Sequence, residues 1–181
     1  LKGMTVEYLL NRSFKVQNSH RVLFHAAAGG VGLIAGQWLK YIGAESIGTV
    51  GSDDKIKLAK DAGYDHVINY NKSNFVEEVA RITGGIGVDV AYDSVGQATY
   101  PHTLFCLKKF GLFVSFGQSS GIIKDIAMGD LAKNGSLYAQ RPTLFDFISS
   151  KESLKQVSEN MFKMLAEGHV KMHINQRYAL K

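Results

Sequence analysis

The sequence predicts an α/β fold in one domain, with helices on both faces of a doubly wound, mostly parallel, six-stranded sheet. Two observations predict it. Short apolar segments of strand type alternate with helical segments at short and regular spacing, which is typical of βαβ units. The 181 residues include nineteen glycines and only two prolines, a composition that suits many tight turns between strands and helices.

The first half of the chain contains an entry helix followed by three pairs of strand and helix. The first strand is a continuous apolar run, as buried parallel strands are. Gly43 and Gly63 follow two of the helices at the position where a left-handed residue ends a helix. The predicted elements are a helix over 4–12, a strand over 22–24, a helix over 31–42, a strand over 46–50, a helix over 53–62, a strand over 66–69 and a helix over 74–83.

The second half continues the alternation and ends in a long helix. Pro101 is compatible with a helix only if it lies in the first turn. Ser150 caps the start of an amphipathic helix, and Gly168 ends it. The predicted elements are strands over 88–93, 112–116, 136–139 and 170–174, and helices over 98–107 and 151–167.

The whole chain is long enough for one domain with a full core. We expect this domain to span 1–181, with an entry helix at about 4–12, a core at about 20–145 and a C-terminal helix at about 150–168. The chain starts at Leu1 rather than Met and stops straight after a predicted strand, so we expect it to be part of a longer protein.

Composition excludes several classes of protein. No apolar run approaches the roughly 20 residues that cross a bilayer, so a membrane protein is not expected. The single cysteine, Cys106, lies in an apolar stretch; we expect a buried thiol, no disulfide and a cytoplasmic location. The net charge of +5 suits phosphates, but the basic residues are scattered, so nucleic-acid binding is not expected.

A glycine-rich loop joins the first strand to the next helix. Ala27, Gly29 and Gly32 have the spacing G-x-G-x-x-G with alanine in the first position. Such a loop lets the backbone approach a pyrophosphate, packs the helix closely on the strand and presents free N–H groups. The flanking strand and helix favour a dinucleotide site of the Rossmann type over a tight turn in another doubly wound protein, such as a methyltransferase. No Gly-Lys-Ser/Thr follows, which excludes a Walker loop.

The tip of the second strand favours NADP over NAD. An NAD site carries an acidic residue about 20 residues beyond the loop, where it binds the ribose hydroxyls. Here Gly51 leaves room for a 2′-phosphate and Ser52 offers a hydroxyl. Lys55 adds an ammonium group, and Tyr70 is placed to cover the adenine or bond the phosphate. Ser52 and the acidic pair 53–54 also suit the next helix, as its cap and its dipole partners, although the acids would weaken phosphate binding.

Taken together and in order, these motifs resemble one family along the whole chain. The sequence resembles the cofactor domain of the bacterial NADPH:quinone oxidoreductases, the zeta-crystallin-like branch of the zinc-free medium-chain dehydrogenases/reductases. The matching segments are 1–5, 25–33, 48–52, 67–70, 82–85, 92–96, 114–117, 133–138, 141–144 and 175–180.

The resemblance implies NADP(H) as the cofactor, a homodimer paired through the edge strand 136–139, and a role for each matching position. Ser94 and Phe116 are equally well explained as a cap and a packed ring at their strand ends. The implied contacts are Gly30 and Val31 at the pyrophosphate; Gly51, Ser52, Lys55 and Tyr70 at the 2′-phosphate; Ser94, Phe116, Gly117, Gln118 and Ser119 at the nicotinamide ribose; Thr5 and Tyr8 facing the nicotinamide; and Pro142, Thr143 and Leu144 closing the far side.

The implied activity is hydride transfer from NADPH to a quinone or another conjugated carbonyl. The GroES-like catalytic domain of that family precedes the matching region, and this chain offers no evident general acid or base. Two other functions stay open: an enoyl or alkenal reductase on the same scaffold, and a truncated module that binds NADP and dimerises without turnover.

The histidines do not predict a metal site. His169 and His173 are four residues apart, but Gly168 and a predicted strand separate them from a helix that could align both. The other histidines are dispersed along the chain. His25 ends the first strand, and we expect a structural role for it. No zinc is therefore expected.

Overall fold

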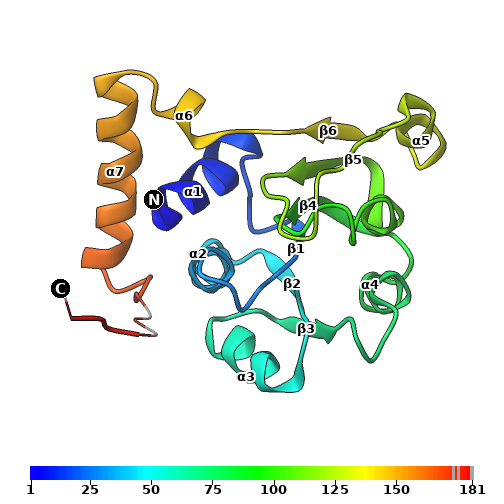
Figure 1. Cartoon of the computed structure of the whole chain (residues 1–181), viewed down its shortest axis with the longest axis horizontal. Coiled ribbons are helices and arrows are strands. Elements are labelled where there is room, and N and C mark those ends of the chain that lie inside the picture. Colours follow the sequence, from blue (N-terminus) through cyan, green and yellow to red (C-terminus); the bar gives the residue numbers. More distant parts are fainter. Residues whose placement is uncertain (173, 175, 180–181) are drawn as a thin grey trace.

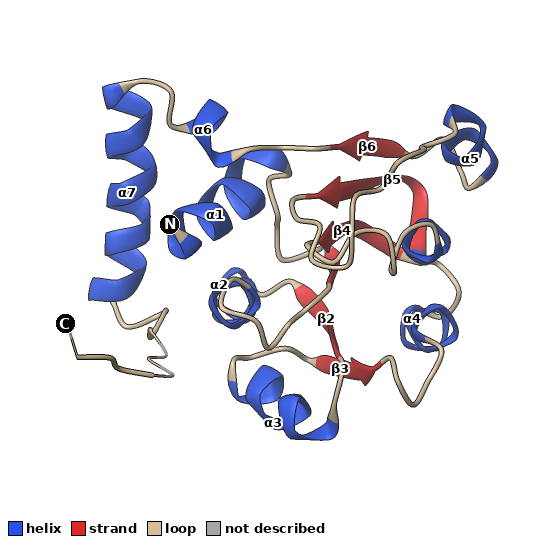
Figure 2. Ribbon diagram, in the orientation of Figure 1, coloured by secondary structure: helices blue, strands red, loops and turns tan. Residues whose placement is uncertain are grey.

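Six parallel strands form one sheet in the spatial order β3-β2-β1-β4-β5-β6 (Figures 1 and 2). The computed structural model describes residues 1–172, 174 and 176–179. All five neighbouring pairs run parallel, which confirms the predicted α/β fold. The order reverses between β1 and β4, where such sheets open a crevice at the carboxyl ends of their strands. The strands are β1 (Arg21–Phe24), β2 (Glu45–Val50), β3 (His66–Asn69), β4 (Val88–Asp93), β5 (Leu107–Ser115) and β6 (Tyr138–Gln140).

The helices begin and end largely where capping residues predicted. Gly43 ends α2 in the left-handed conformation at φ 80°, and Ser150 forms a capping box with Ser153 at the start of α7. In the part of the chain that the structure describes, no helix has the length and apolarity to cross a membrane. The helices are α1 (Lys2–Tyr8), α2 (Gly32–Ile42), α3 (Asp53–Asp61), α4 (Phe75–Thr83), α5 (Met128–Lys133), α6 (Leu144–Phe147) and α7 (Lys151–Ala166), with a π-helical turn η1 (Leu9–Ser13) and a 3₁₀ turn η2 (His102–Cys106).

Helices cover both faces of the sheet, and the alternation of β1 divides the core between them. Val22 and Phe24 belong to the apolar cluster that includes Trp38 of α2, whereas Leu23 belongs to the cluster that includes Val79 of α4. Figure 2 shows α1, α2 and α7 on one side of the sheet and α4 on the other. The central strand is therefore buried on both faces, as its apolar sequence predicted.

The entry segment is helical over the whole of the predicted 4–12 and is tied to α7. It continues past α1 as the wider turn η1. The fully buried carboxylate of Glu7 accepts hydrogen bonds from Arg12 (Nε to Oε2, 2.8 Å) and from Asn160 of α7 (Nδ2 to Oε1, 2.8 Å). A buried carboxylate requires such partners. These bonds fix the helix that carries the predicted nicotinamide contacts.

The prediction of a helix over 98–107 is wrong. Only the 3₁₀ turn η2 forms there, and it follows the cis peptide between Tyr100 and Pro101. Proline has no N–H and its ring obstructs the preceding turn, so a regular helix cannot run through this segment. Leu107 already begins β5, which therefore starts well before the predicted 112–116.

The edge strand β6 is displaced from the predicted 136–139. Ser136 has φ 55°, in the left-handed region outside strand geometry, so the strand starts only at Tyr138. The short helices α5 and α6, which flank β6 in the chain, were not predicted. With six and four residues they are too short to show a helical period.

No strand forms at 170–172 or at residue 174, where one was predicted, and His173 lies outside the described residues. A strand needs a neighbouring strand to bind its backbone N–H and C=O groups. Here a side chain binds these backbone groups instead. Gln37 of α2 donates to Lys171 O (3.2 Å) and accepts from Lys171 N (2.8 Å). The backbone after α7 is thus held against α2 without a strand.

Candidate functional site

The loop between β1 and α2 presents free backbone amides at a helix N-terminus. The N–H of Ala27 donates to Thr49 O (2.9 Å). The N–H of Gly29 donates to Ala26 O (2.9 Å). Among the described residues, none accepts a hydrogen bond from the next three amides, those of residues 30–32. They lie at the first turn of α2, where the helix dipole favours an anion.

Gly32 marks the point where α2 packs directly on the loop backbone. A Cβ at this position would lie 2.5 Å from the carbonyl oxygens of both Ala26 and Ala27. At Gly30 a Cβ would meet the side chain of Lys2, with Nζ at 2.6 Å, which is flexible and able to move. Gly32, the third position of the glycine motif, is therefore the residue that the fold requires to be glycine.

The tip of β2 leaves two polar side chains available beside a glycine. A Cβ at Gly51 would lie 2.6 Å from the hydroxyl oxygen of Tyr70, so the phenol ring occupies that space. Ser52 stands at the N-cap position of α3, but its side chain makes no capping hydrogen bond; the capping role expected for it is wrong. Lys55 is exposed and forms no ion pair with any described residue.

The acidic residue at the start of α3 is engaged by the end of β3. Asn69 Nδ2 donates to Asp53 Oδ1 (2.7 Å), and Lys72 Nζ pairs with Asp53 Oδ2. The hydrogen bonds of Lys72, first, and of Asn69 lower the pKa of Asp53 below its usual value. Neither Asn69 nor Lys72 could be recognised as a partner of Asp53 from the local sequence, because both lie at the end of a different strand from the acid that they bind.

The ends of β4 and β5 bring further predicted residues together. Ser119 N donates to Ser94 O (3.1 Å), and a Cβ at Gly117 would lie 2.7 Å from the same oxygen. Phe116 is half-buried and packs on Phe24 of β1, with ring centroids 5.6 Å apart. The close contact at Gly117 makes these two strand ends one continuous surface next to the phosphate loop.

A buried polar network connects the strand ends beneath this surface. The ring nitrogens Nδ1 and Nε2 of His25 lie 2.9 Å from the hydroxyl oxygens of Thr49 and Thr103. Thr99 donates to the carboxylate of Asp93 (2.6 Å). Burial lowers the pKa of His25, and the charge of Asp93 partly opposes this shift; the ring joins β2 to η2. His25 therefore has the structural role predicted for it.

The entry helix faces the same region. Thr5 is partly buried, and its hydroxyl donates to Leu1 O (3.1 Å) of its own helix. Tyr8 is buried and stacks on Phe147 of α6, with centroids 4.6 Å apart. Burial raises the pKa of Tyr8, and the nearby charge of Arg141 partly opposes this shift. Arg141 was not among the predicted site residues, although it lies within the matching segment 141–144.

The segment after β6 continues from this arginine into α6. Arg141 Nη1 donates to Ser115 O (2.7 Å) at the end of β5. Pro142 and Leu144 are buried, whereas Thr143 is exposed at the N-cap position of α6. Thr143 is thus the one member of the predicted group 142–144 with an accessible polar side chain.

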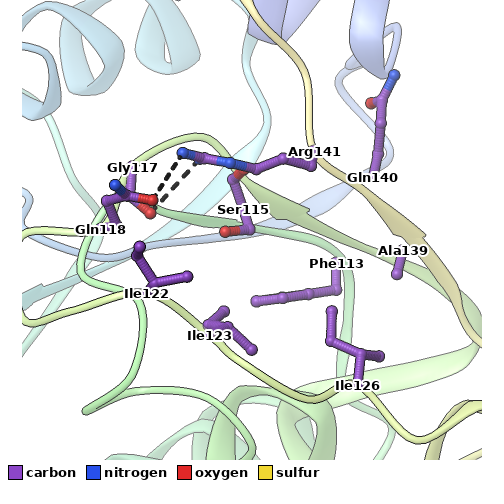
Figure 3. Close-up of a pocket in the computed structure, with 10 residues that line it drawn as sticks. All are labelled: Phe113, Ser115, Gly117, Gln118, Ile122, Ile123, Ile126, Ala139, Gln140 and Arg141. Carbon is purple, nitrogen blue, oxygen red and sulfur yellow. Dashed lines mark hydrogen bonds between the residues drawn. The ribbon is translucent and has the colours of Figure 1, made fainter.

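A pocket of about 360 Å³ lies beneath the loop that follows β5 (Figure 3). Arg141 Nη2 donates to Gln118 Oε1 (3.4 Å) at its rim. Phe113 belongs to the α4-side cluster and Phe116 packs on the opposite cluster, so this pocket and the entry helix are on different sides of β5. The lining residues are Phe113, Ser115, Gly117, Gln118, Ile122, Ile123, Ile126, Ala139, Gln140 and Arg141.

A doubly wound parallel sheet with free amides at the start of α2 defines a dinucleotide-binding domain of the Rossmann type. The family described as zinc-binding dehydrogenase matches residues 30–166, and the chain belongs to this family. The quinone oxidoreductase of Salmonella typhimurium is 51% identical over 100% of this chain and 56% of its own length. Quinone oxidoreductase 1 of Escherichia coli is 47% identical over the same shares.

Solved structures agree with these relatives. The Escherichia coli quinone oxidoreductase complexed with NADPH superimposes with a TM-score of 0.93 at 47% identity, over 96% of this chain and 53% of that one. A 2-haloacrylate reductase structure gives a TM-score of 0.92 at 41% identity, over 94% of this chain and 53% of that one. The chain therefore spans about half the length of the proteins that it matches.

The described residues do not fit a zinc site, despite the family's description. No three His, Cys, Asp or Glu side chains among them are grouped so as to hold a metal ion. Cys106 is buried, as predicted, and burial raises the pKa of its thiol to about 12. Zinc binds the thiolate, so this side chain is not a suitable ligand.

The packing of α2 on the loop predicts the effect of adding one methyl group. Gly32→Ala places a Cβ against two backbone oxygens, and we expect a loss of about 1–3 kcal/mol in the free energy of unfolding, measured in urea. Gly129→Ala in α5 is the matched control, because nothing lies within 4 Å of its Cβ. Equal stability of the two variants would contradict the assignment.

Proposed function

We propose that this chain is the NADP(H)-binding portion of an NADPH-dependent quinone reductase. The observation that carries the proposal is the pairing of two subsites at one edge of the sheet. One is the row of free amides at the start of α2. The other is the tip of β2, where Ser52 offers a hydroxyl and Lys55 a positive charge beside Gly51 and the hydroxyl of Tyr70. This combination suits a dinucleotide that carries a 2′-phosphate.

The phosphate-binding residues act through backbone and charge. The amides of Gly30 and Val31, with the dipole of α2, would hold the pyrophosphate. Ser52 and Lys55 would bind the 2′-phosphate, and Tyr70, whose hydroxyl lies against Gly51, would cover the adenosine. Lys55 is exposed, so its contribution falls as salt concentration rises.

At the other end, the ends of β4 and β5 and the entry helix would orient the nicotinamide ring. NADPH supplies the hydride when bound, and the protein positions it against the acceptor. The buried ring of Tyr8 would support the nicotinamide side of the site, and Thr143 is exposed at the far side. The residues proposed to contact the cofactor are Thr5, Tyr8, Ala27, Gly29, Gly30, Val31, Gly32, Gly51, Ser52, Lys55, Tyr70, Ser94, Phe116, Gly117, Gln118, Ser119, Pro142, Thr143 and Leu144.

A second candidate function is reduction of a different conjugated carbonyl compound. The 2-haloacrylate reductase of Burkholderia is 39% identical over 100% of this chain, against 51% and 47% for the two quinone oxidoreductases. The cofactor half is thus compatible with both acceptors. We propose that the catalytic domain, of the GroES-like type, belongs to the remaining length that the matched relatives have, and that it selects the acceptor.

We also propose that the chain forms a homodimer through the edge of β6, in the cytoplasm. β6 is the last strand of the sheet, and an unpaired edge favours association with another strand. Tyr138 on this strand is 62% exposed, and Ile122 beside the pocket of Figure 3 is 61% exposed. A second copy would cover these apolar groups. The single cysteine, Cys106, is free and buried, which is compatible with a reducing compartment.

The 2′-phosphate assignment predicts a difference between two cofactors. We expect this chain to bind NADPH more tightly than NADH in calorimetric titration. Lys55→Ala is expected to weaken NADPH about tenfold, or ~1.4 kcal/mol, and to leave NADH unchanged. Lys57→Ala removes an exposed lysine of the same helix that pairs with Asp61, and serves as the control. Tighter binding of NADH than of NADPH would refute the proposal.

The acceptor is tested on the longer protein that contains this chain. With NADPH as donor, we expect NADPH to be oxidised faster in the presence of a quinone than in the presence of 2-haloacrylate. The rate is measured as the loss of the absorbance of the reduced nicotinamide. The opposite order would favour the second candidate function. Residues 1–181 alone are expected to bind NADPH with little turnover, because we propose that the acceptor-binding domain corresponds to the part of the relatives that these residues do not match.

The dimer is tested by sedimentation. Tyr138→Lys places a charge on the exposed edge strand and is expected to shift the chain from dimer to monomer. Ile86→Lys, at a 63% exposed site in the turn before β4, is expected to leave the assembly unchanged. A chain that sediments as a monomer without substitution would exclude the dimer.

A further inference from the structure

We propose that Lys72 and Asn69 determine the preference for NADP(H) indirectly, by holding and neutralising the carboxylate of Asp53 beside the 2′-phosphate subsite. This inference rests on the proposed function. An acidic side chain at the tip of the second strand is the feature by which such sites bind the ribose hydroxyls of NAD, and it repels a 2′-phosphate. Asp53 directly follows Ser52 at this tip, so its charge has to be balanced for NADP(H) to be preferred.

The end of β3 holds both oxygens of this carboxylate. Asn69 Nδ2 donates to Oδ1 (2.7 Å), and Lys72 Nζ pairs with Oδ2. Asn69 is itself fixed, because it is 7% exposed and its Oδ1 accepts from Asn71 N (3.0 Å). Asn71 Nδ2 donates to Gly51 O (2.6 Å), so the same turn also binds the tip of β2. Neither oxygen of Asp53 is left without a partner.

The charges around the subsite show why the pairing matters. Asp53 and Asp54 are negative, and Lys55 is the positive group assigned to the phosphate. With Lys72 in place, the two acids and two lysines balance. Without Lys72, an ionised carboxylate remains beside the subsite, and the 2′-phosphate carries further negative charge into the same region. NADH lacks that phosphate, so its binding should be indifferent to the change.

Two other roles for Lys72 make different predictions. If its ammonium group contacted the phosphate directly, its removal would weaken NADPH whether or not residue 53 were acidic. If the pair were only an exposed ion pair, its removal would have almost no effect on either cofactor. A double-mutant cycle between Lys72 and Asp53 separates these roles.

The experiment titrates NADPH and NADH into Lys72→Met, Asp53→Asn and the double variant of this chain. We expect Lys72→Met to weaken NADPH about fivefold and to leave NADH unchanged. In the Asp53→Asn background the same substitution should have no effect, and Lys72→Arg should retain the preference. Lys57→Met breaks the matched exposed pair with Asp61 on α3 and should leave both affinities unchanged. Thermal unfolding verifies that each variant is folded.

Two results would overturn the inference. One is an unchanged ratio of NADPH to NADH affinity in Lys72→Met. The other is an equal loss of NADPH affinity in the presence and absence of the Asp53 carboxylate, which would assign Lys72 to the phosphate itself. Failure of the proposed function is seen separately, because the unsubstituted chain would then show no preference for NADPH.

Discussion

The contact between α2 and the backbone of the preceding loop is the constraint on which the rest of the site depends. At Gly32 the helix axis comes so close to the carbonyls of Ala26 and Ala27 that no side chain fits between them. This closeness places the helix N-terminus, with its unpaired amides, at the carboxyl end of β1. It also sets the position of α2, against which the backbone after α7 is held by Gln37. One steric requirement thus sets the position of the helix N-terminus and of the helix that holds the backbone after α7.

The buried polar network is the second feature that supports the site. It links the ends of neighbouring strands, whose relative positions are not fixed by the pairing of parallel strands alone. The ring of His25 connects β1 to β2 and to η2 through two hydroxyl groups. Asp93 receives the N–H groups of Val95 and Gly96 in the turn after β4. Each polar atom of the network has a partner, which buried groups require. The surface presented to a ligand is therefore supported by hydrogen bonds as well as by apolar packing.

The sequence predicted most of the fold because its signals are local. Strands buried on both faces and helices ended by glycine can be recognised from neighbouring residues alone, and Gly43 and Ser150 behave as expected. The errors fall where a distant or steric factor decides. Pro101 prevents the helix over 98–107, the left-handed Ser136 delays β6, and the Gln37 side chain replaces the strand expected at 170–174. None of these effects has a periodic pattern.

The same distinction applies to the candidate site. The phosphate loop is a local motif, whereas the electrostatics at the tip of β2 depend on β3, sixteen residues or more along the chain. Read by itself, the acidic pair after Ser52 weakens the case for a 2′-phosphate. Asn69 and Lys72 bind the carboxylate of Asp53, so the charge of this member of the pair is already balanced. The effect of an acid near this strand tip therefore depends on its partners from the neighbouring strand, and here the end of β3 binds both oxygens of Asp53.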